Sequence, residues 1–273
     1  MRLVLKESSN LTMAAILSLV VVATMMGCQQ DRPATTTPMT AAPDVEDSLD
    51  PEAVVAQMTS FMSAHETFAF EAKVSYESLQ ESGQKLHFDL LQQVAVSRPG
   101  RLFWVTVEDD ARIDSAWFNA GTFSMIKQPD NIYGQIDVPA TIPEMIDVLA
   151  KDYGLVVPFS DLLSGGEVPV LLRDLEASDY IGLAWVEGKW SHHVAMRNEI
   201  VDYEVWIQAE GDPVPLKVTI TWKLEEGLPA FVARFKTWDF SPGFAEGFFE
   251  FGERTETERI AIVPIQVDEE VAP

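Results

Sequence analysis

The chain has 273 residues, enough for one large domain or two small ones, and 47% of them are hydrophobic. Its formal net charge of −24 repels nucleic-acid phosphates, so we expect no nucleic-acid partner. The single cysteine excludes an intramolecular disulfide, and the folded part must therefore be held together by its hydrophobic core.

The first 27 residues have the organisation of a lipoprotein signal peptide. Arg2 and Lys6 precede an apolar run over residues 14–26, and a small residue stands directly before Cys28. Export signals combine a basic start, an apolar middle and a small residue at the cleavage site. We therefore predict that residues 1–27 are removed and that a lipid on Cys28 anchors the chain to a membrane of the bacterial envelope.

Two alternatives compete with a lipid on Cys28. A transmembrane helix needs about 20 apolar residues, and this run stops sooner, at Gln29. A buried core cysteine does not fit a segment that opens with basic residues and continues into a Pro/Thr-rich tract. Because Gln29 rather than Asp follows the cysteine, the sequence resembles lipoproteins sorted to the outer membrane, with the domain facing the periplasm.

Residues 28–49 contain few large apolar side chains, and we predict a flexible tether there. Structure is expected to begin at Asp50, which can cap a helix whose first residue is Pro51. Apolar residues recur at helical spacing on one face up to about His65, which predicts an amphipathic helix.

The periodicity then changes to that of strands, in which residues alternate between polar and apolar. Glycine, proline and asparagine punctuate the pattern, and such short turns join antiparallel neighbours. The expected strands are 68–76, a segment centred on Phe88, 102–107, 115–119, 122–127, 132–138, 180–186, 190–197, 202–208, 216–224 and 230–240.

A helical insertion divides these strands. Thr141 and Glu144 have the spacing of a capping box, and Gly154 is placed to end the helix that follows. Two shorter helices are expected over residues 159–163 and 168–175.

About eleven antiparallel strands with these helices predict a mainly β, α+β fold. We expect one curved, unclosed sheet, a half-barrel, with the N-terminal helix and the insertion on its concave side. A two-sheet sandwich is the alternative, but it would not need helices inserted in the middle of the meander. The predicted domain spans residues 50–252 and is followed by an acidic tail over residues 253–273.

Three segments carry a resemblance to a known family: residues 50–88, 171–207 and 215–242, the last beginning PLKVTITWKLEEGLPAF. They resemble a family of predicted periplasmic proteins, the domain of unknown function 2092. Its members are similar in turn to the lipoprotein carrier and receptor LolA and LolB, which implies an unclosed half-barrel with helices over a hydrophobic cavity. The predicted anchor is more like the receptor than the carrier, and no short segment matches the functional residues of the carrier.

The most chemically suggestive residues follow one another on two neighbouring strands. If Arg197 opposes Asp202, then His193 opposes Trp206, and His192 points to the apolar side. Adjacent histidines on a strand point to opposite faces, which disfavours a metal site. We therefore expect an Arg197–Asp202 ion pair and a histidine packed on tryptophan, with no metal and no cofactor.

Nothing in the sequence marks a catalytic centre. There is no Gly-x-Ser-x-Gly elbow, the one cysteine is assigned to the anchor, and paired carboxylates occur at turns, where solvated surface is the default. We expect a protein that is not an enzyme.

Large aromatic residues on the apolar strand faces exceed what a thin one-sided sheet requires. They either fill the hollow of the half-barrel as core or line a cavity for an acyl chain. The candidate cavity residues are Phe70, Tyr76, Phe88, Trp104, Trp185, Trp222 and Phe235.

Two functions remain open from the sequence. In the first, the protein binds a lipid or a lipoprotein acyl chain at the membrane surface, in lipid or lipoprotein transport or in maintenance of the envelope. In the second, it is an envelope interaction or assembly protein whose hollow is filled by its own side chains.

Overall fold

The computed structural model describes residues 41–43, 48–128, 130–165, 174–252 and 256–265, all within one compact unit. Cys28, most of the predicted tether and most of the helix expected at 168–175 lie outside the described residues.

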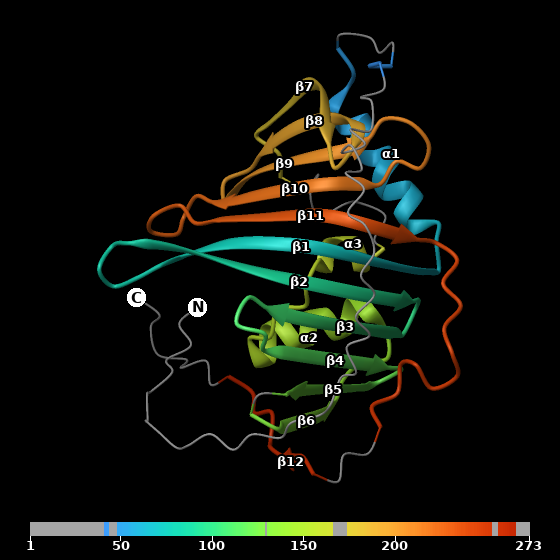
Figure 1. Ribbon diagram of the computed structural model, residues 1–273, viewed down its shortest axis with the longest axis vertical. Helices are drawn as coiled ribbons and strands as arrows, with labels where there is room; N and C mark the ends of the chain where they lie inside the picture. Colours follow the sequence, from blue (N-terminus) through green and yellow to red (C-terminus); the bar gives the residue numbers. More distant parts are fainter. Residues whose placement is uncertain (1–40, 44–47, 129, 166–173, 253–255, 266–273) are drawn as a thin grey trace, which may run out of the picture. The chain divides into compact units, whose positions relative to one another are not determined.

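The described chain forms one sheet with the strand order β12-β6-β5-β4-β3-β2-β1-β11-β10-β9-β8-β7 (Figure 1). The end strands do not pair with each other, so the sheet is unclosed. The strands are β1 (Thr67–Leu79), β2 (Lys85–Ser97), β3 (Arg101–Glu108), β4 (Ile113–Asn119), β5 (Thr122–Lys127), β6 (Ile132–Asp137), β7 (Ala177–Val186), β8 (Lys189–Arg197), β9 (Val201–Gln208), β10 (Pro215–Trp222), β11 (Ala230–Asp239) and β12 (Glu258–Arg259).

The predicted single antiparallel sheet is confirmed, with one addition. The short strand β12 pairs with β6 in parallel, and its two residues are too few to produce a periodic pattern in the sequence. The strand expected at 216–224 ends earlier, at Trp222, and Leu224 is exposed in the turn that follows.

The three helices of the described residues lie against one face of the sheet, which we call the inner face; the opposite face is the outer face. Helix α1 (Pro51–Ser63) packs on β7, β8 and β9, and Asp50 Oδ1 accepts the Glu52 N–H at 3.0 Å, as the predicted cap requires. Figure 1 shows α2 (Ile142–Tyr153) and α3 (Ser160–Leu163) behind the strands β1 to β5.

The helix ends follow the sequence signals with one difference. Gly154 ends α2 at φ 63°, in the left-handed conformation that favours glycine. The Thr141 side chain, however, makes no bond to the backbone of the helix; its hydroxyl donates to Glu144 Oε2 at 2.7 Å. The two residues are thus neighbours, but they do not form the expected capping box.

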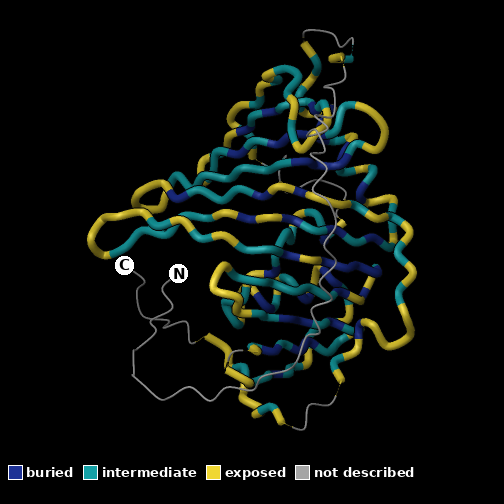
Figure 2. Tube along the Cα trace, in the orientation of Figure 1, coloured by how far each residue is buried: buried dark blue, intermediate teal, exposed yellow. Residues whose placement is uncertain are grey.

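The alternation of burial along the strands reflects these two faces (Figure 2). On β1, Phe68, Phe70, Ala72 and Val74 are buried on the inner face. They join the buried side chains of α2 in the larger of two hydrophobic clusters. The smaller cluster lies between α1 and β8 and β9.

The outer face is covered in part by the segment that follows β11. Phe248 packs on Phe103 with ring centroids 5.2 Å apart, and Phe251 packs on Trp117 at 5.3 Å and on Tyr133 at 5.2 Å. The segment therefore contributes aromatic side chains to a face that the sheet leaves without helices.

The turn between β2 and β3 is close-packed against the start of α2. The Ile142 N–H donates to the Pro99 carbonyl at 2.8 Å, and a Cβ added to Gly100 would lie 2.5 Å from the Ala140 carbonyl oxygen. Only glycine fits at this approach of two backbones.

We therefore expect Gly100→Ala to lower the free energy of unfolding by about 1–3 kcal/mol, because the added methyl group forces the turn away from α2. Urea denaturation would measure the change. Gly243→Ala is the matched control, since a Cβ there meets nothing within 4 Å. Equal stability of the two variants would contradict this account of the turn.

Candidate functional site

The inner face carries a layer of packed aromatic rings where β1 meets β11. The Phe70 ring lies 5.5 Å from Phe235 and 4.8 Å from Trp238, centroid to centroid. Phe70 and Phe235 are 4% and 2% exposed. Two of the seven candidate cavity residues are therefore buried in the core of this conformation.

Phe159 fills the space in front of that layer. It caps the N-terminus of α3, and its ring lies 5.2 Å from Phe70, 5.3 Å from Phe235 and 6.3 Å from Phe231. Its backbone has φ 56°, a left-handed conformation that costs a residue other than glycine about 1 kcal/mol or more. The packing of the ring offsets this cost, so Phe159 acts as a plug on the inner face.

Toward the far ends of the same strands, the aromatic surface is only partly covered. Tyr76 stacks on Phe88 at 5.4 Å, and Trp222 meets Phe231 edge-on at 6.4 Å. All four are intermediate in exposure. They continue the inner-face surface beyond the plug.

The remaining candidate residues are dispersed. Trp104 stacks on Phe123 at 5.9 Å and packs against the larger cluster. Trp185 lies on the edge strand β7, 38% exposed, and meets Trp190 at 5.3 Å. The structure thus brings together Phe70 and Phe235 at the plug and Tyr76, Phe88 and Trp222 beyond it, and it sets Trp104 and Trp185 apart.

One cavity among the described residues lies beside the aromatic layer. It measures about 150 Å³ and touches Phe235 and Trp238. Ligand pockets usually measure about 300–1,000 Å³. A large apolar ligand fits at this cavity only if the plug moves.

Arg98 fastens the helices that would have to move. Its guanidinium donates to the carbonyl oxygens of Met62 (3.0 Å) and His65 (2.6 Å) at the end of α1. It also donates to those of Leu162 (3.1 Å) and Leu163 (3.3 Å) at the end of α3. Helix C-termini leave carbonyl groups without partners and carry partial negative charge, which a guanidinium matches.

The surroundings of Arg98 are tight and partly apolar. The guanidinium lies 5.0 Å from the centre of the Phe68 ring, and a Cβ on Gly165 would come within 3.0 Å of its Nε. Burial lowers the pKa of Arg98, but an arginine side chain remains charged. We call the set of hydrogen bonds from Arg98 to α1 and α3 the Arg98 latch.

The histidine pair has the predicted arrangement. Arg197 opposes Asp202 and donates two hydrogen bonds to its carboxylate at 2.6 and 2.8 Å, while the His193 ring stacks on Trp206 at 4.1 Å. His192 is half-buried and bonds the Tyr180 hydroxyl at 3.0 Å, and burial lowers its pKa.

The ion pair of Arg197 with Asp202 and the stack of His193 on Trp206 stabilise the register of β8 and β9.

Within the described ranges, no group of three or more His, Cys, Asp or Glu side chains is placed to hold a metal ion. In the same residues, no helix has the length and apolar character needed to cross a bilayer.

A family model described as predicted periplasmic protein (DUF2092) matches residues 51–263. The chain belongs to this family. The resemblance seen in the sequence is thereby confirmed. No curated protein matches the sequence of this DUF2092 member.

Three solved structures that are similar to this chain are distant from it in sequence. Lipoprotein LppX of Mycobacterium tuberculosis is 12% identical with a TM-score of 0.42, covering 72% of this chain and 99% of that one. A conserved protein of Thermus thermophilus is 8% identical with a TM-score of 0.42, covering 77% and 98%. A LolA superfamily protein of Nitrosomonas europaea is 5% identical with a TM-score of 0.37, covering 75% and 99%.

Sequence reasoning missed the two residues that organise the site of this DUF2092 protein. In the sequence, Arg98 is part of a turn signal with Pro99 and Gly100. Its hydrogen-bond partners are backbone carbonyl groups, and every residue has such a group, so no side-chain pattern predicts which ones it binds. Phe159 had the pattern of a first helical residue. Its role as a plug depends on a left-handed backbone that no local signal predicts for phenylalanine.

We expect Arg98→Met to lower the free energy of unfolding by about 2–4 kcal/mol, because buried carbonyl groups of α1 and α3 lose their donors. Arg98→Lys should recover only part of this, since an ammonium cannot reproduce the guanidinium fork. Urea denaturation would measure both variants.

The matched control is Arg112→Met. Arg112 is paired with Glu108 and Asp110 at an exposed turn, where solvent screening leaves an ion pair with little effect on stability. If Arg98→Met were no less stable than Arg112→Met, the latch would not hold the helices.

Proposed function

We propose that this protein is an envelope lipoprotein that binds an apolar ligand, a lipid or a lipoprotein acyl chain, on the inner face of its sheet. In this proposal a lipid on Cys28 anchors it to the outer membrane, and its domain faces the periplasm and catalyses no reaction. The observation that carries the proposal is a continuous aromatic surface. Phe159 plugs one half of it, and the other half, with Tyr76, Phe88 and Trp222, is only partly covered.

The plug sets a minimum size for the ligand. Removing a fully buried phenylalanine ring costs about 3–5 kcal/mol, which is the upper limit for the partly buried Phe159. Each methylene group buried in its place contributes about 0.8 kcal/mol. An apolar chain that buries about four to six methylene groups therefore offsets the displacement of the ring, which selects long acyl chains over short ones.

A buried polar atom supports a ligand with a polar end. Tyr203 is 3% exposed, and its hydroxyl has no hydrogen-bond partner within the described part of the chain. Burial, followed by the charge of Asp161 on α3, raises its pKa, so the hydroxyl stays protonated. It is available to donate to the carbonyl oxygen of an ester or acid.

The second candidate function is that of an interaction protein with a self-filled core. The burial of Phe70 and Phe235 behind Phe159 favours it, because the chain itself occupies the space. In that case the inner face takes up no ligand, and removing the plug leaves a destabilised domain.

The two proposed functions predict different results for the uptake of a fluorescent sixteen-carbon fatty acid. The protein tested is residues 28–273 with the substitution Cys28→Ser. We expect the unsubstituted inner face to bind the probe and Phe159→Ala to bind it several-fold more tightly, because no ring has to be displaced. Fluorescence titration measures the affinity, and a six-carbon analogue should not bind.

Phe103→Ala is the matched control, since it removes a ring of the same size from the outer face. Absence of uptake by both the parent and Phe159→Ala, with both folded by circular dichroism, would leave the interaction protein as the better account.

The anchor is tested separately in the full chain. We expect the protein to fractionate with the outer membrane and Cys28→Ser to abolish the mass added by lipid, because the thiol is the attachment point. Mass spectrometry of the extracted protein measures the modification. An unmodified Cys28 in the membrane fraction would rule out the anchor and leave the inner-face proposal untouched.

A further inference from the structure

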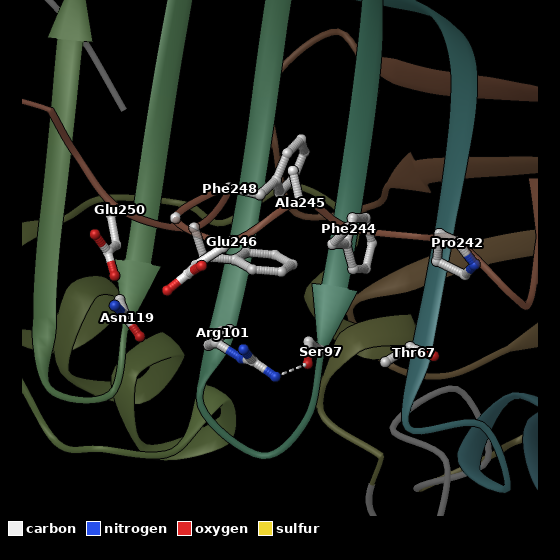
Figure 3. A pocket seen from close by; sticks show the side chains of 12 residues that line it. Thr67, Ser97, Arg101, Asn119, Pro242, Phe244, Ala245, Glu246, Phe248 and Glu250 are labelled. Carbon is white, nitrogen blue, oxygen red and sulfur yellow. Dashed lines mark hydrogen bonds between the residues drawn. The ribbon is translucent and has the colours of Figure 1, made fainter.

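A second hollow lies on the outer face, on the other side of the sheet from the plug. It has a volume of about 460 Å³, is open to solvent on one side, and lies between the strand ends and the segment after β11 (Figure 3). Ser97, Arg101 and Asn119 line it from the sheet, and Phe244, Glu246 and Glu250 line it from the segment. Its size is within the range of small-molecule sites.

Arg101 is held in place without being neutralised. Its Nη2 donates to Ser97 Oγ at 2.7 Å, and its guanidinium lies 5.5 Å from the centre of the Phe249 ring. Ser97 and Phe249 are 2% and 4% exposed, so both supports are buried, while Arg101 itself is exposed. Stacking on a ring and one hydrogen bond orient the guanidinium but leave most of its five N–H donors for another partner.

Two other arginines of this acidic chain are bound by carboxylates on both sides or bidentately. Arg112 pairs with Glu108 and Asp110, and Arg197 pairs with Asp202. Arg101 forms no ion pair with any residue that the structure describes, although Glu246 and Glu250 line the same hollow. A guanidinium that is oriented but unpaired is suited to an anionic group of a ligand, such as a phosphate.

The two carboxylates indicate what else the ligand carries. In Figure 3, the side chains of Glu246 and Glu250 extend from the segment toward the strand ends that hold Arg101 and Asn119. A plain anion would be repelled by them and by the net charge of −24. A zwitterion has no net charge, and its ammonium group would face the carboxylates while its anion meets Arg101.

We propose that this hollow binds a zwitterionic phosphoethanolamine group, with the phosphate on Arg101 and the ammonium between Glu246 and Glu250. The group could belong to a phospholipid or to a free small molecule. Phe248 lines the hollow and is 37% exposed, which offers an apolar contact to the glycerol and acyl part of a lipid. This site is independent of the inner face.

The test uses the full chain, extracted from membranes in a neutral detergent and titrated calorimetrically with glycerophosphoethanolamine. We expect Arg101→Gln to weaken binding about tenfold or more, since a charge-assisted contact to phosphate is lost. Glu246→Gln should weaken the binding of glycerophosphoethanolamine several-fold. The same variant should strengthen the binding of glycerol 3-phosphate, which has the anionic group and lacks the ammonium group.

Dihexanoyl phosphatidylethanolamine distinguishes the two sources. Tighter binding of this lipid than of glycerophosphoethanolamine supports a membrane lipid, and equal binding supports a free molecule. Arg112→Gln is the matched control and should bind like the parent protein.

Two results would overturn the proposal. One is the absence of glycerophosphoethanolamine binding at millimolar concentration by the parent protein. The other is a Glu246→Gln variant that changes the affinities for both ligands in the same direction. The second test remains possible even if Arg101→Gln fails to fold, because Glu246 is exposed and its substitution should leave the protein folded.

Discussion

The structure depends on one turn, formed by Arg98, Pro99 and Gly100 between β2 and β3. Arg98 joins the ends of α1 and α3, Pro99 accepts the first N–H of α2, and Gly100 accepts the Ala120 N–H at 2.7 Å. The three helices that the structure describes are thus fastened to the sheet at a single place. A guanidinium suits this role because helix C-termini offer several carbonyl groups and no carboxylate needs to be buried with it.

The position of this turn explains why the inner face has a covered half and an open half. The helices are attached where β2 ends and β3 begins. Tyr76 and Phe88 lie toward the opposite end of β1 and β2, and Trp222 and Phe231 lie beside the turn that joins β10 and β11. The aromatic pairs there remain partly exposed, since the helices that the structure describes are fastened at the other end of these strands, so the proposed binding surface is a consequence of where the latch is placed.

The sequence predicts those parts of the fold in which polar and apolar side chains follow a regular period. Alternation along β1 predicts which of its residues are buried, and the pairing of Arg197 with Asp202 predicts the stack of His193 on Trp206. The contacts that govern the site are of another kind. The Arg98 latch is made with backbone carbonyls about 33 to 65 residues away, and Phe159 acts through a left-handed backbone, so neither leaves a periodic signal.

The helices of the inner face are not equally free to move. At one end of α2 the Ile142 N–H bonds Pro99, and at the other the Ile265 N–H bonds the Asp152 carbonyl at 2.7 Å, so the chain fixes both ends of this helix. Helix α3 has four residues, buries Leu163 and is tied to the sheet through the Arg98 latch. Since Phe159 caps α3 rather than α2, the plug and the helix that the Arg98 latch holds are one unit. Under the proposed function, α3 and Phe159 would move together while α2 stays in place, a smaller rearrangement than displacement of the whole helical layer.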